Sequence, residues 1–409
     1  MRFLFVHQNF PGQFLHLVRH LHEQGGHEIV FISEANEGHL PGVRRVLYRQ
    51  DRQVSAHTHP SLRELELGLI RAEAVARAAA TLKSLGYTPD IIIGHHGWGE
   101  LLNIVDVYPS TPILGYFEFF YHTDRNDVDF DPEFPPRTDL FPTVRVKNAI
   151  NLLALNLNQY GQTPTLFQRS TYPDWAQERI TLLREGVNLD LCAPDPAIFK
   201  GEVVIGPHVI SPKDKLITFV ARNLEPYRGI HSFLRALPAV LEERPDARIV
   251  LIGGDGTSYG APPPAEVGSW RDLFLKEVAS RIDLDRVHFL GKVDYDTFRT
   301  ALKRSDAHVY LTYPFVASWS LREAMATGCA LIGSETASVE EFISDRQTGL
   351  LAPFLEPDAI ARAILEILED RRLARRLRKN ARQFAENALS LDHYLANYDR
   401  LIASIVGQA

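Results

Sequence analysis

Cysteine is scarce in this chain. Its 409 residues include two cysteines, Cys192 and Cys329, and no Cys-x-x-Cys pair. A disulfide framework and a cysteine-based zinc site are therefore excluded. His95 and His96 are adjacent in sequence, which is a poor geometry for binding one metal ion, and no other segment has metal-ligand spacing. We therefore expect neither a metal nor another cofactor.

Long apolar runs and an excess of positive charge are also missing. No run of about 18 apolar residues occurs, so we expect no membrane-spanning helix. The chain opens on a strand-like segment instead of a basic leader with an apolar stretch. The formal net charge is −7, which disfavours bulk attraction to nucleic acid. We expect a cytoplasmic protein that binds no nucleic acid. Contact with the inner face of a membrane and the oligomeric state stay open.

The chain does contain many short apolar segments rich in β-branched residues, separated by amphipathic stretches. Their nearly continuous apolarity is typical of parallel strands that are buried on both faces. In the first half the expected strands are Phe3–Val6, Glu28–Ile32, Ile91–Ile93, Ile113–Tyr116, Ala149–Leu155 and Ile180–Leu183. In the second half they are Leu216–Val220, Arg248–Ile252, Val287–Leu290, Ala307–Leu311, Ala330–Ile332 and Leu350–Leu351. The helices expected between these strands are Ile230–Glu243, Ser269–Ser280, Tyr295–Arg304, Ser320–Thr327, Ser338–Ile343 and Pro357–Leu368.

Alternation of strands and helices in both halves predicts the α/β class, with two doubly wound Rossmann-like domains. A proline-rich stretch separates the halves. We therefore expect an N-terminal domain over residues 1–195, a linker over 196–212 and a C-terminal domain over 213–385. A C-terminal helix over 386–409 is expected to pack back toward the N-terminal domain. Ligands of such sheets bind at the carboxyl ends of the strands.

Two arginines bracket a turn at one of these strand ends. Arg222 and Arg228 follow the predicted strand Leu216–Val220 and precede a helix that starts at Ile230. Two guanidinium groups at this spacing can converge on one diphosphate, because each planar fork binds two oxygens and stays charged. The alternative interpretation is a pair of ordinary surface arginines.

A second candidate segment runs from Phe315 to Gly328. Ser318 and Ser320 can begin a helix, whose amino end suits a phosphate. Glu323 lies three positions after Ser320, so it can either complete a capping box with that serine or accept hydrogen bonds from ribose hydroxyls.

Polar and aromatic residues gather at the predicted strand ends of the first half. Gly12 lies in a turn after the first strand, where backbone can approach a ligand closely. His96, Trp98, Glu118 and His122 follow two other strands, and flat rings among polar groups can form a sugar-binding platform. The alternative is the aromatic edge of a core.

The segment from Gly253 to Gly256 contains Gly-Gly-Asp-Gly but is not a nicotinamide fingerprint, because Tyr259 stands where the third glycine is required. We interpret Gly254 as part of a strand-end turn near a nucleotide.

In their order and spacing these segments resemble the retaining glycosyltransferases of family 4, which have the GT-B fold with two domains facing each other across a cleft. Further matching segments are Glu185–Asn188, Phe289–Val293 and Thr348–Leu351. The resemblance implies transfer of a sugar from a nucleotide diphosphate donor, UDP or GDP linked, to a saccharide, lipid-linked or other acceptor with retention of anomeric configuration. It implies no metal requirement, and it suggests a place in polysaccharide biosynthesis.

The resemblance also implies domain and residue roles. The domain over residues 1–195 would be the acceptor-side domain, with His96, Trp98 and His122 near the acceptor, and the domain over 213–385 would be the nucleotide-sugar-binding domain. Arg222 and Arg228 would hold the diphosphate and stabilise the leaving group, and Glu323 would hold the ribose. Val293, beside Lys292, would contact the base through its backbone. Backbone groups and the closing glycine loop would hold the donor sugar and its phosphate, and the residues at this part of the site are Gly12, Phe315, Ala317, Ser318 and Trp319.

The sequence departs from the family pattern at the donor sugar. Phe315 replaces a carboxylate that would bond sugar hydroxyls. Glu118 stands where the family often has a histidine, and we hypothesise that it supplies the missing carboxylate. Two alternatives remain: a degenerate copy that binds a nucleotide or partner without turnover, and a sugar-nucleotide epimerase of the same architecture.

Overall fold

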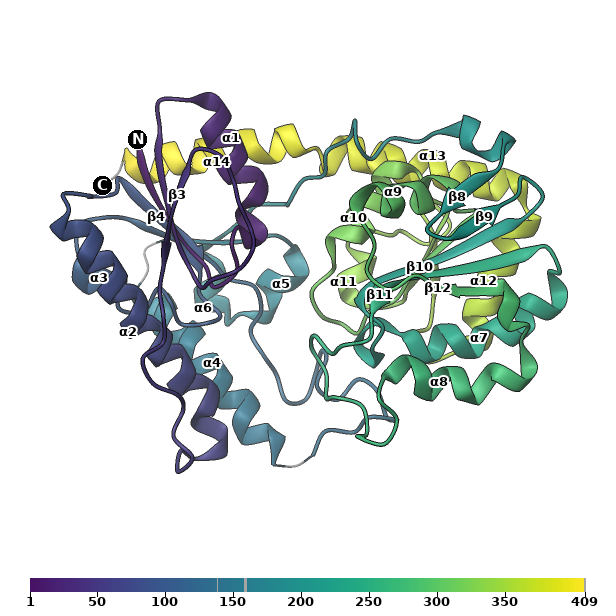
Figure 1. Ribbon diagram of the computed structural model, residues 1–409, viewed down its shortest axis with the longest axis horizontal. Helices are drawn as coiled ribbons and strands as arrows, with labels where there is room; N and C mark the ends of the chain where they lie inside the picture. Colours follow the sequence, from purple (N-terminus) through teal and green to yellow (C-terminus); the bar gives the residue numbers. More distant parts are fainter. Residues whose placement is uncertain (138, 158–159, 408–409) are drawn as a thin grey trace. The chain divides into compact units, whose positions relative to one another are not determined.

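The computed structural model describes residues 1–137, 139–157 and 160–407. Internal contacts divide the chain into two compact units. The first comprises Met1–Glu185 together with Asp392–Ala409, and the second comprises Gly186–Leu391. Figure 1 shows that each unit contains its own sheet and its own helices.

Seven parallel strands form the sheet of the first unit, in the order β3-β2-β1-β4-β5-β6-β7. They are β1 (Arg2–Val6), β2 (Glu28–Ser33), β3 (Val43–Leu47), β4 (Ile91–His95), β5 (Ile113–Tyr116), β6 (Tyr160–Thr163) and β7 (Ile180–Leu182). The strand order reverses between β1 and β4, so their carboxyl ends flank a topological switch point, where ligands of such sheets bind.

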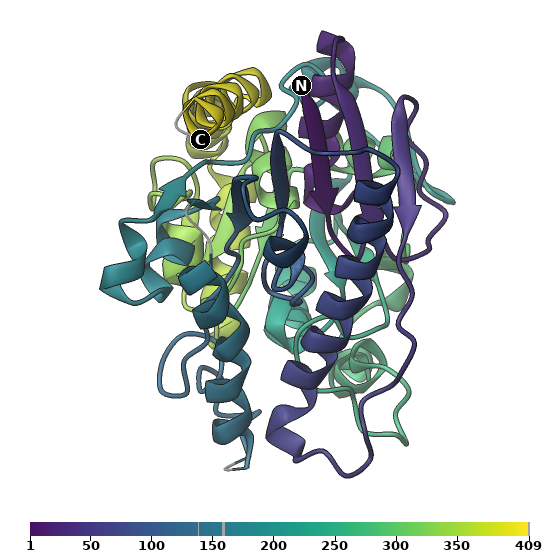
Figure 2. The same ribbon diagram turned by 90° about the vertical axis from the view of Figure 1, so that its left-hand side faces the viewer.

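Helices cover both faces of this sheet. They are α1 (Leu15–Gln24), α2 (Arg63–Ser84), α3 (Ile104–Val107), α4 (Leu140–Leu157), α5 (Leu166–Thr171), α6 (Asp174–Gln177) and α14 (Leu391–Val406), with short 3-10 turns η1 (Gly12–Phe14) and η2 (Pro60–Leu62). Side chains alternate along β1, so Leu4 and Val6 join a core with α2 and α3, and Phe5 packs against Phe14. The C-terminal helix α14 is tied to β6 by a hydrogen bond from Gln162 to the hydroxyl of Tyr398. Figure 2 shows α2 and α4 as the long helices of this unit.

One predicted strand of the first half is wrong. Residues 149–155 lie inside the helix α4, with Ile150 and Ala154 buried four positions apart on one helical face. An apolar run of this length satisfies either a strand or a buried helix face, and only packing distinguishes the two. The strands β3 and β6 were not predicted, because β3 contains two arginines and β6 a glycine and a glutamine.

Six parallel strands form the sheet of the second unit, in the order β12-β11-β10-β13-β14-β15. They are β10 (Lys215–Asn223), β11 (Ala247–Gly254), β12 (Val287–Phe289), β13 (Ala307–Tyr310), β14 (Leu331–Ser334) and β15 (Leu350–Ala352). All six strands predicted for the second half are confirmed. Here the order reverses between β10 and β13, which places a second switch point at their carboxyl ends.

The helices of the second unit alternate with these strands. They are α7 (Ile230–Glu243), α8 (Trp270–Val278), α9 (Tyr295–Arg304), α10 (Trp319–Thr327), α11 (Ala337–Glu340), α12 (Pro357–Glu369) and α13 (Arg371–Ala388), with 3-10 turns η3 (Pro196–Lys200), η4 (Pro226–Arg228), η5 (Ala279–Arg281) and η6 (Leu284–Arg286). The apolar sides of α9, α10 and α13 meet in the main core, through Leu302, Met325 and Ala381.

The segment 196–212, for which we expected a linker, is folded onto the second unit. It contains η3 and an antiparallel hairpin of β8 (Val203–Ile205) and β9 (His208–Ile210). Ile205 and Ile210 are buried in the core of that unit. The prolines of this stretch therefore mark turns around a short hairpin, not an extended connection.

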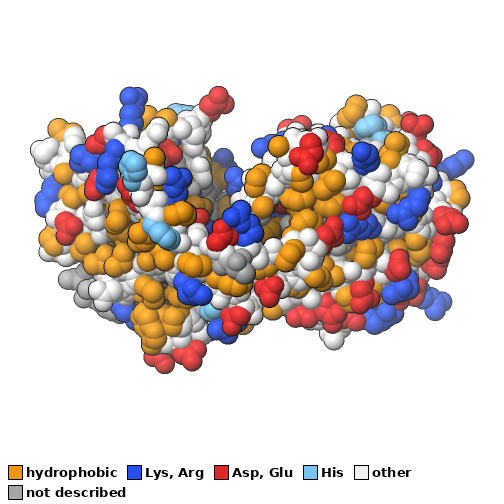
Figure 3. Space-filling model, turned by 90° about the horizontal axis from the view of Figure 1, so that it is seen from below, with side chains coloured by type: hydrophobic (Ala, Val, Ile, Leu, Met, Phe, Trp, Pro, Cys, Tyr) orange, Lys and Arg blue, Asp and Glu red, His pale blue; other side chains and the backbone are white. Residues whose placement is uncertain are grey.

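None of the helices in the described ranges is long and apolar enough to span a membrane. Figure 3 shows hydrophobic side chains gathering on the surface of the first unit. The exposed large hydrophobic residues of this unit include three leucines of α4, Leu152, Leu153 and Leu157, each at least 40% exposed.

Candidate active site

Arg222 and Arg228 lie at the switch point of the second sheet. Arg222 is the penultimate residue of β10 and is exposed, whereas Arg228 lies in η4 and is only 4% exposed. Neither side chain forms an ion pair with a carboxylate in the described part of the chain. The predicted role of the two arginines in holding one diphosphate stays a prediction, and the structure adds that they differ strongly in burial.

The guanidinium of Arg228 is held in place by two neutral acceptors. Its Nη1 donates to the hydroxyl of Thr312 (2.9 Å) and to the carbonyl of Val316 (3.0 Å). The ring of Tyr259 lies 4.9 Å from the guanidinium carbon. Burial lowers the pKa of Arg228, but Tyr310, Tyr259 and Glu225 together raise it by more, so the group stays charged. Nη1 is occupied by these contacts, which leaves the N–H groups of Nε and Nη2 for a ligand.

Gly254 lies close to Asn223, to Lys292 and to the backbone of Arg222. A Cβ on Gly254, the last residue of β11, would lie 2.7 Å from Oδ1 of Asn223 and 3.0 Å from Cε of Lys292. A side chain at this position would therefore displace Asn223 or Lys292. The structure brings Gly254 and Lys292 together, as their common assignment to the nucleotide requires.

Glu323 lies on α10 and is half-buried. Its Oε1 accepts a hydrogen bond from the hydroxyl of Tyr295 (2.8 Å), the first residue of α9. Burial raises the pKa of Glu323, and the bond from Tyr295 opposes this only in part. The capping-box alternative is wrong, because the N-cap of α10 is Ser318 and not Ser320, and Glu323 bonds Tyr295.

Phe315 is buried in an aromatic cluster. Its ring lies 5.8 Å from that of Tyr227 and 5.1 Å from that of Tyr259, and Tyr259 in turn covers Arg228. The side chain at the position of the missing carboxylate thus supports the wall around Arg228. Its predicted place beside the donor sugar stays a prediction.

The backbone of the loop before α10 was predicted to cradle sugar and phosphate. Ala317 is buried in the core, and Trp319 is 36% exposed. The N–H of Ser318 donates to the hydroxyl of Tyr310 (2.7 Å), so it is already used within the protein. Val293, predicted to contact the base, is partly buried against the core.

In the first unit, the switch point gathers two histidines around Glu118. Nε2 of His95, at the end of β4, lies 3.5 Å from Oε2 of Glu118, which follows β5. The ring of His7, which follows β1, lies 5.4 Å from the ring of His95. Gly12 adjoins this group: it has a positive φ of 54°, and a Cβ there would lie 2.8 Å from Nδ1 of His7.

The pKa shifts of His7 and Glu118 decide which of these two groups is charged. Burial and the neighbouring His95 lower the pKa of His7 to about 3, so His7 is neutral at physiological pH. Burial raises the pKa of Glu118, but His95, His7 and Lys147 together lower it by more, so Glu118 is ionised. The site therefore presents an anionic carboxylate beside a neutral imidazole.

The three residues predicted to bind the acceptor lie in different settings. His96 is buried, its ring packs 4.8 Å from Phe117, and burial and His95 lower its pKa to about 3. Nε2 of His122 donates to the carbonyl of Thr171 (2.7 Å). Trp98 is 36% exposed and stacks on His95. The alternative of an aromatic core edge describes His96 better, whereas Trp98 remains accessible.

Sequence reasoning missed three members of these sites: His7, His95 and Tyr295. His7 and His95 stand at the ends of predicted strands, which was an available signal. Tyr295 opens a helix that was predicted with the correct bounds, but nothing in the sequence connects it to Glu323.

Two parallel α/β units, each with polar residues at its switch point, define a protein of the GT-B class. The whole chain superposes on sucrose-phosphate synthase from Thermosynechococcus elongatus with a TM-score of 0.74 at 18% identity, covering 100% of both chains. Anabaena HepE in complex with UDP and glucose matches with a TM-score of 0.69 at 16% identity, covering 99% of this chain and 100% of that one. At these identities the likeness shows the fold.

Sequence comparison identifies the family. The profile described as glycosyl transferase family 4 group matches residues 25–192, and that of glycosyl transferases group 1 matches residues 205–384. The chain belongs to these group 1, family 4-type glycosyltransferases.

Curated relatives match over part of the chain. A D-inositol 3-phosphate glycosyltransferase of Streptomyces avermitilis is 25% identical over 213 residues, which are 51% of this chain. A phosphatidyl-myo-inositol mannosyltransferase of Mycolicibacterium smegmatis is 30% identical over 164 residues, which are 39% of this chain. The chain spans less than half of the length of these relatives, 43% and 37% respectively.

Proposed function

We propose that this protein is a retaining glycosyltransferase that transfers a sugar from a UDP- or GDP-sugar to a saccharide, lipid-linked or other acceptor without a metal ion. The observation that carries the proposal is the burial of Arg228 at the switch point of the second sheet with only neutral acceptors bound to it. The HepE structure, which holds UDP and glucose, supports a UDP donor.

The physical reason lies in the cost of a buried charge. Removing a guanidinium from water is unfavourable by several kcal/mol unless an anion compensates it. Thr312 and Val316 satisfy two N–H groups but provide no negative charge. The nearby carboxylate of Glu225 raises the pKa of Arg228, but it accepts hydrogen bonds from backbone N–H groups of Ser258 and Tyr259 and forms no ion pair with Arg228 in the described part of the chain. A diphosphate would provide that charge and two oxygens for the remaining N–H groups. The exposed Arg222 would close on the same anion from the strand end.

Glu323 and Lys292 complete the proposed nucleotide site. The bond from Tyr295 orients the carboxylate of Glu323, so that its other oxygen can accept a ribose hydroxyl. Lys292, packed beside Gly254 and Asn223, would add positive charge near the nucleotide, and the backbone of Val293 would contact the base.

For the hydroxyls of the donor sugar we propose Glu118. Ionised Glu118 would accept hydrogen bonds from sugar hydroxyls in place of a carboxylate at position 315, and His95 would orient it. In the retaining step the bond from the anomeric carbon to the leaving phosphate oxygen breaks. The acceptor oxygen attacks from the same face, and its proton passes to the released phosphate oxygen. Arg222 and Arg228 would stabilise the charge that develops there.

The exposed leucines of α4 are compatible with a membrane-linked acceptor. The exposed leucines of α4 offer an apolar surface on the acceptor-side unit, and the mannosyltransferase relative is named for a phosphatidylinositol acceptor. We therefore include a cytoplasmic protein with peripheral contact to the membrane in the proposal.

The test is a transfer assay with UDP- and GDP-sugars in the presence of EDTA, using wild-type protein and the variant Arg228→Met. Product configuration is read by proton NMR. We expect an α-linked product from an α-linked donor, undiminished by EDTA, and at least about a hundredfold loss in Arg228→Met, because two charge-assisted bonds disappear. Arg235→Met, on the surface of the same unit, is the matched control.

Other outcomes would identify the alternatives. Tight nucleotide binding with no transfer or donor hydrolysis indicates a degenerate binding protein. Conversion of the donor sugar to an isomer without an acceptor indicates an epimerase. An inverted product refutes the retaining mechanism while leaving the donor site intact.

A further inference from the structure

A basic pocket lies at the amino ends of the strands of the second sheet, whereas the proposed donor site lies at their carboxyl ends. It has a volume of about 970 Å³ and is lined by residues at the amino ends of the strands, including Lys215, which opens β10, and Asp306, which precedes β13. The proposed donor residues follow the carboxyl ends of the same strands. Because each residue of a strand rises ~3.3 Å, the two ends of the nine-residue β10 lie roughly 26 Å apart. The pocket is therefore a separate site.

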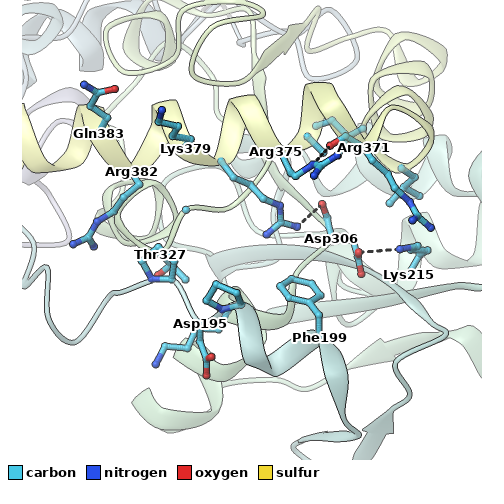
Figure 4. A pocket seen from close by; sticks show the side chains of 18 of the residues that line it. Asp195, Phe199, Lys215, Asp306, Thr327, Arg371, Arg375, Lys379, Arg382 and Gln383 are labelled. Atoms are coloured by element: carbon cyan, nitrogen blue, oxygen red, sulfur yellow. Dashed lines mark hydrogen bonds and ion pairs between the residues drawn. The ribbon is translucent and has the colours of Figure 1, made fainter.

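The helix α13 forms one side of this pocket and is strongly basic. Its sequence holds seven basic residues and one acidic residue, in a chain whose net charge is −7. Arg371, Arg375 and Lys379 follow one another at intervals of four and all line the pocket. Like charges at this spacing repel one another on a helix surface. Figure 4 shows these side chains along the pocket side of α13, with Phe199 on the facing wall.

Most of the carboxylates at the pocket are already engaged. Asp306 pairs with Lys215 (3.3 Å), and Glu386 pairs with Arg382 (2.7 Å). Within the described ranges, no carboxylate pairs with Arg371, Arg375, Lys379 or Lys303, all of which line the pocket. Four cations thus face one cavity without a counter-ion from the protein.

A buried hydroxyl supplies a second, independent observation. Thr327 lines the pocket and is 4% exposed, and its Oγ1 has no hydrogen-bond partner among the residues that the structure describes. Buried hydroxyl groups are ordinarily bonded. An anionic ligand oxygen would accept that hydrogen bond.

Part of the remaining lining is apolar. Phe199, Pro196, Ile367 and Leu368 contribute to the walls. Phe199 is held by two guanidinium groups, with Arg378 5.1 Å and Arg304 5.0 Å from its ring. A ligand that fits this pocket has a charged head for α13 and an apolar group for the facing wall.

We propose that this pocket binds an organic phosphate, a molecule that joins a phosphate group to an apolar moiety. The phosphate contacts Arg371, Arg375 and Lys379, and the apolar part lies against Phe199. The ligand is either a free phosphorylated metabolite or the headgroup region of an anionic phospholipid, and both present the same chemistry. This site does not depend on the proposed transferase activity.

The test uses 1-naphthyl phosphate as the probe and isothermal titration calorimetry on the full chain. The pocket variant is Arg375→Gln with Lys379→Gln. The matched control is Arg372→Gln with Arg376→Gln, which removes the same charge from the same helix at residues that do not line the pocket. Both positions of the pocket variant are exposed and the substitutions keep helix propensity, so the fold should persist.

We expect the pocket variant to bind the probe at least about tenfold more weakly than wild type, and the control within about twofold, since one lost charge-assisted hydrogen bond has an effect of this size. 1-Naphthol and inorganic phosphate, each offering half of the ligand, should bind more weakly than the probe.

A second arm identifies the source of the ligand. Sedimentation with phosphatidylglycerol vesicles, compared with phosphatidylcholine vesicles, detects a lipid headgroup. Binding that the pocket variant loses and the control keeps supports the site in either arm, and the arm in which it occurs names the source. Equal losses in both variants, binding that survives in the pocket variant, or no binding in either arm overturns the proposal. A loss of sugar transfer alone leaves these readouts unaffected.

Discussion

Replacing Arg228 by lysine is expected to weaken UDP binding about 10- to 150-fold. The guanidinium uses Nη1 for Thr312 and Val316, which leaves three N–H groups on Nε and Nη2. Two of them can form a parallel pair of bonds to a diphosphate. A lysine that keeps the bonds to Thr312 and Val316 has one N–H left, so one of two bonds to the anion is lost. A hydrogen bond involving a charged group contributes about 1.5–3 kcal/mol, which corresponds to this range.

The assay is isothermal titration calorimetry with UDP, paired with uridine. Uridine lacks the phosphates, so its affinity should change less than about twofold in Arg228→Lys. Arg235→Lys serves as the matched control, since Arg235 forms a surface ion pair with Glu277 in the same unit. Circular dichroism establishes that each variant is folded.

Two results would refute this reasoning. Unchanged UDP affinity in a folded Arg228→Lys protein means that the buried guanidinium does not contact the diphosphate. Equal weakening of UDP and uridine means that the substitution disturbs the loop around Val316, and that Arg228 has a structural role.

The remaining predictions concern the neighbours of this arginine and the first unit. Burial raises the pKa of Glu323, so donor affinity that needs the ionised carboxylate is full above that pKa and is lost as pH falls through it. The bond from Tyr295 lowers this pKa, so in a titration of donor affinity against pH Tyr295→Phe should move the loss of affinity to higher pH, whereas the control Tyr160→Phe should not. An unchanged pH dependence in Tyr295→Phe contradicts the role of Glu323. Gly254→Ala should weaken UDP binding about tenfold, because its Cβ would contact Asn223 and Lys292. The control Gly201→Ala, whose Cβ would meet nothing within 4 Å, should leave UDP binding unchanged. Equal effects of the two substitutions would mean that Gly254 does not lie at the nucleotide site. Glu118→Gln should lower turnover about 10- to 150-fold by weakening the bonds to sugar hydroxyls, and unchanged donor affinity and turnover would falsify its assignment.

The histidines at the strand ends of the first unit illustrate what local sequence could and could not predict about the sites. The strand ends were predictable, because apolar segments stop where polar residues begin, and this placed Gly12, Glu118 and Arg222 correctly along the chain. The contact between His95 and Glu118 was not predictable, because it depends on β4 and β5 being neighbours in register. The same limit applies to Tyr295 and Glu323, which lie 28 residues apart.

The sequence by itself determined the α/β class and the positions of the second-unit strands along the chain, since buried parallel strands need continuous apolar runs and the helices between them need amphipathic spacing. It also determined the bounds of α7 and α9. Only the tertiary structure decided that residues 149–155 belong to a helix, that Phe315 packs with Tyr227 and Tyr259, and that Arg228 is buried without an ion pair among the described residues. These outcomes depend on which surfaces meet after the chain has folded, and burial, pairing and pKa follow from those contacts, not from neighbours in sequence.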